Sequence, residues 1–185
     1  AGRLRKALEN TLHDLDPESK DSALQQMVVI GHSQGGLLTK LTAIDTGTKF
    51  WEILSKKPFS QVKLEPETRE LLKQSLFFKP LPFVKRVVFI STPQHGAMLA
   101  AYQFVTGLVS KLVSLPMTVM TGIQQVATAT GDEKLTAILR RPPTAVDNMN
   151  PDNPGLKILA SIPVTAVPAH SIIAVEGDGP KEQGD

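Results

Sequence analysis

The sequence predicts an α/β fold built on a parallel sheet, and two observations support this prediction. First, two short apolar runs, at residues 27–30 and in the segment 84–90 once past Lys85 and Arg86, have the β-branched composition of buried strands. Second, the segments around them carry apolar residues at helical spacing. Strands and helices that alternate in this way form parallel sheets with right-handed crossovers. We therefore expect a sheet flanked by helices, with the first strand, over residues 26–31, buried on both faces.

The expected helices follow from apolar spacing and from the residues that end them. The first ends before Asp16-Pro17, because a residue that precedes proline disfavours the helical conformation. The second is closed by Gly47, and the fourth carries Pro66 in its first turn, where proline is tolerated. The helices are expected over residues 1–15, 34–46, 50–54, 65–73 and 155–161. The last strand is expected over residues 162–164 and then 170–175.

Length and composition limit the domain count and the function classes. A chain of 185 residues with 41% apolar content is long enough for one core and short for two. The net charge of +2 is dispersed, which argues against a nucleic-acid partner. The absence of cysteine excludes a disulfide scaffold and thiolate metal sites, and the isolated histidines show no metal-ligand spacing. No apolar run has the length of a membrane span, and neither compartment nor oligomeric state is indicated.

The chain begins without methionine on a helical pattern, and it ends on a loop-like stretch. We therefore expect residues 1–185 to form a single, incomplete domain. Within it, residues 97–140 are helical in pattern and too apolar for one helix that faces solvent. This segment is interpreted as a helical lid, or cap insertion, over an acyl-binding pocket. The alternative is an ordinary pair of core helices with a partner surface.

A Gly-x-Ser-x-Gly pattern lies between the first strand and the helix that follows it, at Gly31, Ser33 and Gly35. In that context it predicts a nucleophile elbow, a sharp turn that exposes the serine oxygen at the edge of the sheet. The two glycines are expected to allow the strand and the helix to approach closely. Gln34 stands at the helix start, so its backbone N–H is a candidate oxyanion-hole donor. A phosphate-binding turn is the alternative, although Lys40 lies too far along the helix for a P-loop.

Three stretches together resemble the α/β-hydrolase superfamily, in particular its lipase and esterase-like members. They are VVIGHSQGG at residues 28–36, VVFISTPQHG at residues 87–96 and HSII at residues 170–173. The resemblance covers most of the chain and corresponds to a middle section of the family domain. It implies a partial α/β-hydrolase fold in which Ser33 is the nucleophile. It also implies that the catalytic acid and then the histidine follow the serine along the chain.

None of the four histidines follows the last predicted strand, so we expect the triad histidine beyond residue 185. His95 follows a strand at its carboxyl end. It is predicted to line the substrate pocket or to contact the residues that do so. His32 lies beside Ser33 and is given a supporting, packing role. His13 is expected to be solvated and His170 to be structural.

The resemblance implies an acid in the loop after the last strand, where relatives carry an Asp-Gly-Val-like sequence. Asp185 is the tentative acid, or its immediate neighbour. Asp178 is the alternative, although Asp-Gly is more often a turn.

The expected activity is that of a serine hydrolase that cleaves carboxylic esters through an acyl-enzyme, without a cofactor or metal. The expected substrate is a small-molecule ester or lipid with an apolar acyl group, compatible with transient contact with a lipid interface. This chain alone is expected to be inactive, because the base and the second oxyanion donor are not found in it. Two alternatives stay open. One is a non-catalytic module that binds lipid or protein, and the other is an acyltransferase or lipid deacylase that uses the same elbow.

Overall fold

The computed structural model describes residues 2–96, 117–131 and 150–173. Contacts divide the chain into two compact units. The first comprises residues 1–45, 78–94 and 159–185, and the second comprises residues 46–77 and 95–158. Each unit has a hydrophobic cluster of its own within the described residues.

The first unit contains a three-stranded sheet in the order β1 (Met27–His32), β2 (Val84–Ile90) and β3 (Ala169–Ile172). Both pairings are parallel, and Phe89 in the middle strand is the partner of Gly31 on one side and Ser171 on the other. The predicted α/β class with a parallel sheet is therefore confirmed.

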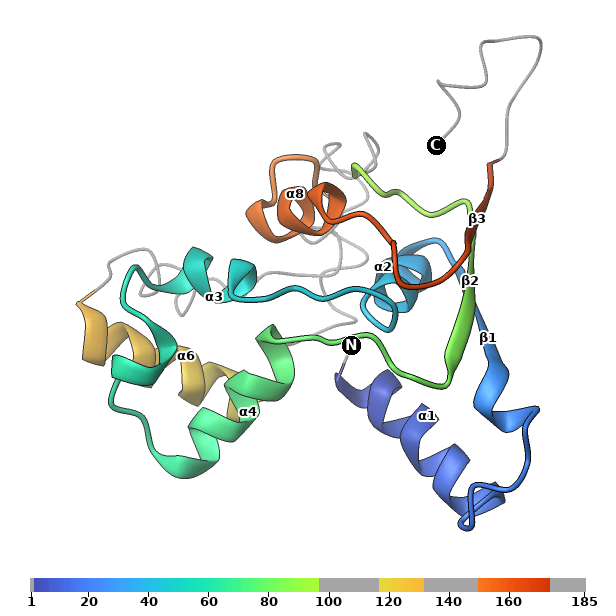
Figure 1. Ribbon diagram of the computed structural model, residues 1–185. Coiled ribbons are helices and arrows are strands. Elements are labelled where there is room, and N and C mark those ends of the chain that lie inside the picture. The colour runs from blue at the N-terminus through green and yellow to red at the C-terminus, as the bar shows by residue number, and fades with distance from the viewer. Residues whose placement is uncertain (1, 97–116, 132–149, 174–185) are drawn as a thin grey trace, which may run out of the picture. The chain divides into compact units, whose positions relative to one another are not determined.

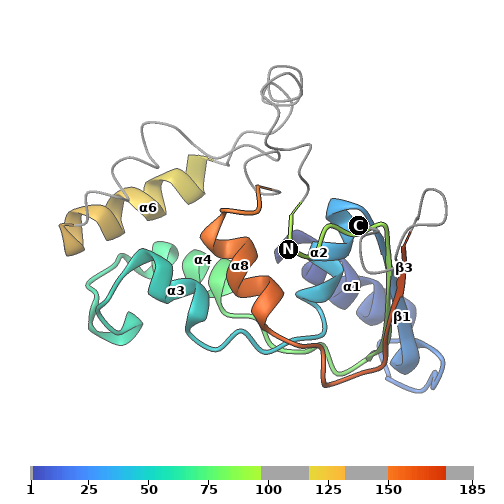
Figure 2. The same ribbon diagram turned by 90° about the horizontal axis from the view of Figure 1, so that it is seen from above.

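Helices α1 (Gly2–Leu15) and α2 (Gln34–Lys40) lie on the same face of this sheet, as both views show (Figures 1 and 2). Leu8 and Leu12 of α1 pack against the cluster beneath. That cluster consists of Val29, Ala43, Leu81, Phe83, Val84, Val87 and Phe89. After α1, the buried carboxylate of Asp16 accepts the backbone N–H groups of Lys20 at 2.8 Å and Asp21 at 3.0 Å. The predicted first helix is confirmed.

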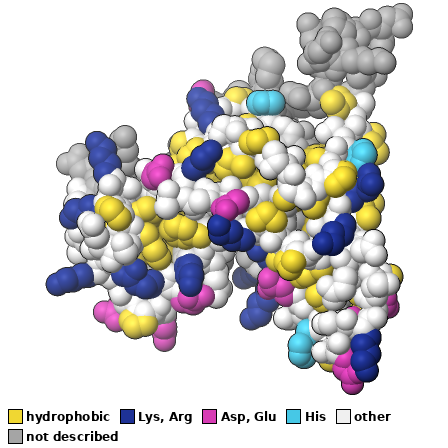
Figure 3. Space-filling view, viewed as in Figure 1, with side chains coloured by type: hydrophobic (Ala, Val, Ile, Leu, Met, Phe, Trp, Pro, Cys, Tyr) yellow, Lys and Arg dark blue, Asp and Glu magenta, His cyan; other side chains and the backbone are white. Residues whose placement is uncertain are grey.

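The opposite face of the sheet is not covered by any helix described for the first unit. In β1, Val28 is 52% exposed and Ile30 is 62% exposed, whereas Val29, which lies between them, is buried. In β3, Ile172 is 56% exposed. Hydrophobic side chains are visible beside a histidine and basic side chains at the right-hand edge of Figure 3. The expectation that the first strand is buried on both faces is therefore wrong for this chain.

Helix α2 is shorter than predicted, because it ends at Lys40 and not near residue 46. The Thr42 hydroxyl donates to the Thr39 carbonyl at 2.7 Å, and the Thr42 carbonyl accepts the Leu81 N–H at 2.8 Å. Threonine hydroxyls compete with helical bonding in this way. The long-range bond from Leu81 then holds the Thr42 carbonyl outside the helix.

The second unit contains α3 (Lys49–Leu54), α4 (Pro66–Leu76) and α6 (Met117–Thr130). Its core gathers Trp51, Val62, Leu72, Ile123, Val126 and Ala127. The Trp51 indole N–H donates to the Lys57 carbonyl at 2.8 Å, and its ring meets Phe59 edge-on at 4.9 Å. The Arg69 guanidinium bonds the carbonyls of Phe59 at 3.1 Å and Val62 at 2.6 Å, which fixes the loop before α4.

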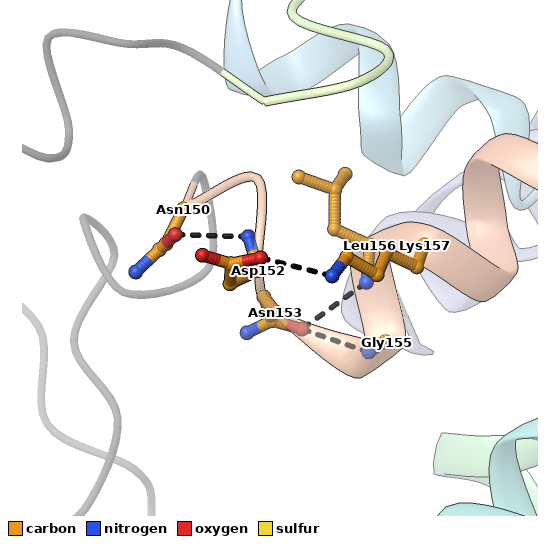
Figure 4. A network of polar contacts seen from close by, with 6 residues as sticks. All are labelled: Asn150, Asp152, Asn153, Gly155, Leu156 and Lys157. Carbon is orange, nitrogen blue, oxygen red and sulfur yellow. Dashed lines mark hydrogen bonds and ion pairs between the residues drawn. The ribbon is translucent and has the colours of Figure 1, made fainter.

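A polar network starts α8 (Pro154–Ser161), as Figure 4 shows. The Asn153 side-chain oxygen accepts the N–H groups of Gly155 at 2.8 Å and Leu156 at 3.1 Å. These bonds satisfy two donors that have no partner within the helix. Asp152 and Lys157 add an exposed ion pair at 2.9 Å. The predicted helix at residues 155–161 is confirmed.

Other expectations for the carboxyl-terminal half have mixed outcomes. Residues 162–164 are not a strand, and β3 ends at Ile172. Of the predicted lid at residues 97–140, the structure describes 117–131, where α6 packs against α4. Two short 3₁₀ helices lie at Leu24–Gln26 and Phe59–Gln61. Among the described helices, none is both long and apolar enough to cross a bilayer.

Candidate functional site

The candidate site is the junction between β1 and α2, which a single residue forms. Ser33 has φ 51° and ψ −130°, with strand on one side and helix on the other. A positive φ is uncommon for a residue other than glycine and costs free energy. The Ser33 N–H donates to the Ile90 carbonyl at 2.8 Å, so the end of the neighbouring strand holds the serine. The strand therefore turns into the helix within one strained residue, as the elbow motif predicts.

The strand and the helix approach each other at Gly31 and Gly36. A Cβ at Gly31 would lie 2.5 Å from the Gly36 Cα and closer still to the Thr39 hydroxyl. A Cβ at Gly36 would lie 2.6 Å from Thr92 Cγ2 and closer to its hydroxyl. At Gly35 a Cβ would meet no atom within 4 Å. The expectation that position 35 must lack a side chain is therefore wrong, although the Gly35 carbonyl oxygen does lie close to the strand, 2.7 Å from a Cβ at Gly31.

That neighbouring loop, residues 91–94, follows β2, and the sequence motif does not include it. Ser91 also has a positive φ, 45°, and its N–H donates to the Ile172 carbonyl at 2.9 Å. Thr92 is buried against Gly36, and the Gln94 N–H closes a tight turn onto the Thr92 carbonyl at 2.8 Å. The loop lies within the stretch VVFISTPQHG, and Ser-Thr-Pro directly after an apolar strand stands at the edge where α/β proteins bind ligands.

No family model, curated protein or solved structure matches this chain.

Ser33 is partly exposed. In the described part of the first unit, no side chain hydrogen-bonds to it. Gln34 is the first residue of α2 and directly follows the serine, as the oxyanion-hole prediction requires. Asp185, the tentative acid, and Asp178, its alternative, lie outside the described residues.

The described histidines are all exposed. His13 faces solvent on α1, 3.5 Å from the Asp14 carboxylate, which confirms the prediction that it is solvated. His32 ends β1 with its side chain exposed, which does not favour the packing role given to it. His170 is the second residue of β3 and contacts the Arg86 guanidinium on the next strand. His95 belongs to the second unit.

Two cations in the first unit are buried to different degrees, Lys40 almost fully and Arg5 in part. Lys40, the last residue of α2, is 6% exposed, and burial lowers the pKa of its ammonium group. Burial also lowers the pKa of the Arg5 guanidinium, while Glu9 acts in the opposite direction. Arg5 donates to the Leu41 carbonyl at 3.0 Å and lies over the Phe78 ring at 5.8 Å. Both cations have carbon stems that pack while the charge is desolvated.

The described residues contain no group of three or more histidine, aspartate or glutamate side chains that could hold a metal ion. The chemistry available at the described site is that of a hydroxyl group held at the edge of a parallel sheet.

Proposed function

We propose that this chain is part of an α/β-hydrolase domain and that Ser33 is the nucleophile of a serine hydrolase that cleaves carboxylic esters. The observation that carries the proposal is the backbone of Ser33, with φ 51° between β1 and α2. Strained residues other than glycine persist where the surrounding structure holds them, and they are frequent at active sites. The glycines at 31 and 36 are needed for the same turn, because a side chain at either position would clash.

In this proposal the Ser33 oxygen attacks the ester carbonyl carbon, and its proton passes to a general base. The bond to the leaving alkoxide breaks, and the base returns the proton to that oxygen. Water then attacks the acyl-enzyme, which releases the carboxylic acid and restores the serine. The Gln34 N–H would stabilise the oxyanion, an interaction worth about 3 kcal/mol of barrier for one donor.

The proposed acid is Asp185, with Asp178 as the alternative, and the proposed base is a histidine that follows the acid, in keeping with the order serine, acid, histidine of this fold. The substrate proposed is a small-molecule ester or lipid with an apolar acyl group. Acyl-enzyme chemistry of this kind requires no cofactor.

The proposal is tested on the full-length protein with a fluorophosphonate probe, which labels activated serines covalently. The wild type should be labelled and Ser33→Ala should not. The matched control is Ser19→Ala, because Ser19 is another serine at positive φ, 53°, but lies in the loop after α1. This control should keep the label. Turnover of a series of p-nitrophenyl esters of increasing chain length then reports the preferred acyl group.

A folded wild type that takes no label would overturn the serine hydrolase and favour the non-catalytic binding module. Labelling at Ser33 with transfer of the acyl group to an added alcohol in preference to water would favour the acyltransferase. Equal labelling of Ser33→Ala and the wild type would show that another residue is the nucleophile.

A further inference from the structure

The side-chain oxygen of Gln94 is buried and has no hydrogen-bond partner. Among the residues that the structure describes, it is the one buried side-chain nitrogen or oxygen in this condition. A buried acceptor without a partner loses its bonds to water and gains nothing in exchange. Such groups are rare in native proteins, and a donor on a bound molecule can satisfy them. Gln94 is therefore a candidate ligand-binding group.

The position of Gln94 connects it to the serine site. Ser33 donates its N–H to Ile90, the last residue of β2, and Gln94 lies four residues beyond Ile90. Between them, Thr92 packs against Gly36 in the first turn of α2. The loop of residues 91–94 therefore stands beside the junction that presents the serine. This is the carboxyl edge of the parallel strands, where ligands bind in α/β proteins.

The local backbone holds this loop in place without using the Gln94 side-chain oxygen. The Gln94 N–H is bonded to the Thr92 carbonyl, and the Ser91 N–H is bonded to the Ile172 carbonyl. An apolar side chain of similar length, such as methionine, would fill the same space without leaving an acceptor unpaired. A glutamine here therefore fits a donor that arrives with a ligand.

We propose that Gln94 is a specificity-determining residue of the serine site. Its side-chain oxygen accepts a hydrogen bond from a hydroxyl or amide N–H that the ester substrate carries near its scissile carbonyl. The inference rests on the proposed function of Ser33. It narrows the substrate class from esters in general to esters with a hydrogen-bond donor close to the reacting bond.

The test uses matched ester pairs and the full-length protein. One pair differs on the acyl side, a p-nitrophenyl 3-hydroxyacyl ester against the ester without the hydroxyl. The other pair differs on the alcohol side, a 2-hydroxyethyl ester against the 2-methoxyethyl ester of the same acid. The pair that shows a preference identifies which side of the substrate carries the donor.

The variants are Gln94→Met and, as a matched control, Gln26→Met. Gln26 is an exposed glutamine in the 3₁₀ helix before β1, at the opposite end of that strand. We expect the wild type to prefer the hydroxyl-bearing ester of one pair by about tenfold in kcat/KM. Gln94→Met should lose the preference and Gln26→Met should keep it. Removing an unpaired buried acceptor should also raise the unfolding midpoint of Gln94→Met, by about 2–4 °C.

The outcomes separate this inference from the proposed function. Fluorophosphonate labelling of Ser33 with no preference in either pair, or with the same preference in Gln94→Met, would overturn the role of Gln94 and leave the hydrolase standing. A Gln94→Met protein that unfolds at a lower temperature than the wild type would show a structural role and also overturn it. A folded wild type without labelling would overturn both.

Discussion

The contact between α2 and the loop after β2 predicts opposite effects for the same substitution at two adjacent glycines. Gly35 and Gly36 both lie in the first turn of α2, so replacing either by alanine gains up to about 1 kcal/mol of helix propensity. At Gly35 the new methyl group meets open space, and the gain should remain. At Gly36 it would lie 2.6 Å from Thr92 Cγ2 and 2.7 Å from its Cβ. Overpacking of this kind costs about 1–3 kcal/mol.

The propensity contributions cancel between the two variants, so the difference in stability isolates the clash. We expect Gly36→Ala to be about 1–3 kcal/mol less stable than Gly35→Ala, which corresponds to about 2–4 °C for each kcal/mol in a protein of this size. Urea unfolding followed by far-UV circular dichroism measures this difference. Fluorescence is less suitable, because the only tryptophan, Trp51, lies in the second unit.

Thr92→Gly supplies the second side of a double-mutant cycle. Combined with Gly36→Ala, it should recover most of the lost stability, since the clashing atoms are gone. Equal stability of Gly35→Ala and Gly36→Ala would refute the reasoning. It would mean that α2 does not pack against the loop as described.

Three further predictions concern strain, a buried carboxylate and a buried cation. Ser33→Gly should be about 1 kcal/mol more stable than Ser33→Ala by urea unfolding, because glycine tolerates a positive φ and alanine does not. Asp16→Ala should lose about 2–3 kcal/mol with the two N–H bonds that its carboxylate accepts, whereas Asp14→Ala, at an exposed site, should change little. Lys40→Met should be more stable than the wild type at neutral pH, because burial disfavours the charged ammonium. The lowered pKa of Lys40 means that the unfolded state binds more protons, so the wild type gains stability as pH rises through that pKa towards 10.5. Unfolding midpoints of the two proteins should therefore converge at alkaline pH, and a constant gap would contradict the assignment to charge burial.

The elbow could be predicted from the sequence because its determinants are local. An apolar strand, a serine between glycines and a helical pattern follow one another within residues 27–40. The strained φ of Ser33 agrees with that prediction. The identity of the tightly packed glycine could not be predicted, because it depends on Thr92, which is 56 residues beyond Gly36 in the chain. Gln94 was missed for the same reason, since an unpaired acceptor is visible only when its surroundings are known.

The burial of the sheet was predicted less well than its topology. The run of apolar residues at 27–30 has the composition of strands with two covered faces. In the structure, Val29 is buried while Val28 and Ile30 are exposed on the opposite face. Composition indicates how apolar a strand is, but each face is buried only where another layer packs on it. Val28 and Ile30 meet no such layer among the helices described for the first unit.

The carboxyl edge of the sheet shows how neighbouring strands stabilise the strained serines. Ser33 follows β1 and donates its N–H to Ile90, the last residue of β2. Ser91 follows β2 and donates its N–H to Ile172, the last residue of β3. In both cases a non-glycine residue with positive φ is held by the end of the next strand, at 2.8 and 2.9 Å. Each bond contributes about 1 kcal/mol, comparable with the cost of the left-handed backbone. The strained turn therefore depends on the register of the sheet. A shift of β2 by one residue would remove the partner carbonyl from Ser33 and, with it, the geometry that presents the serine oxygen.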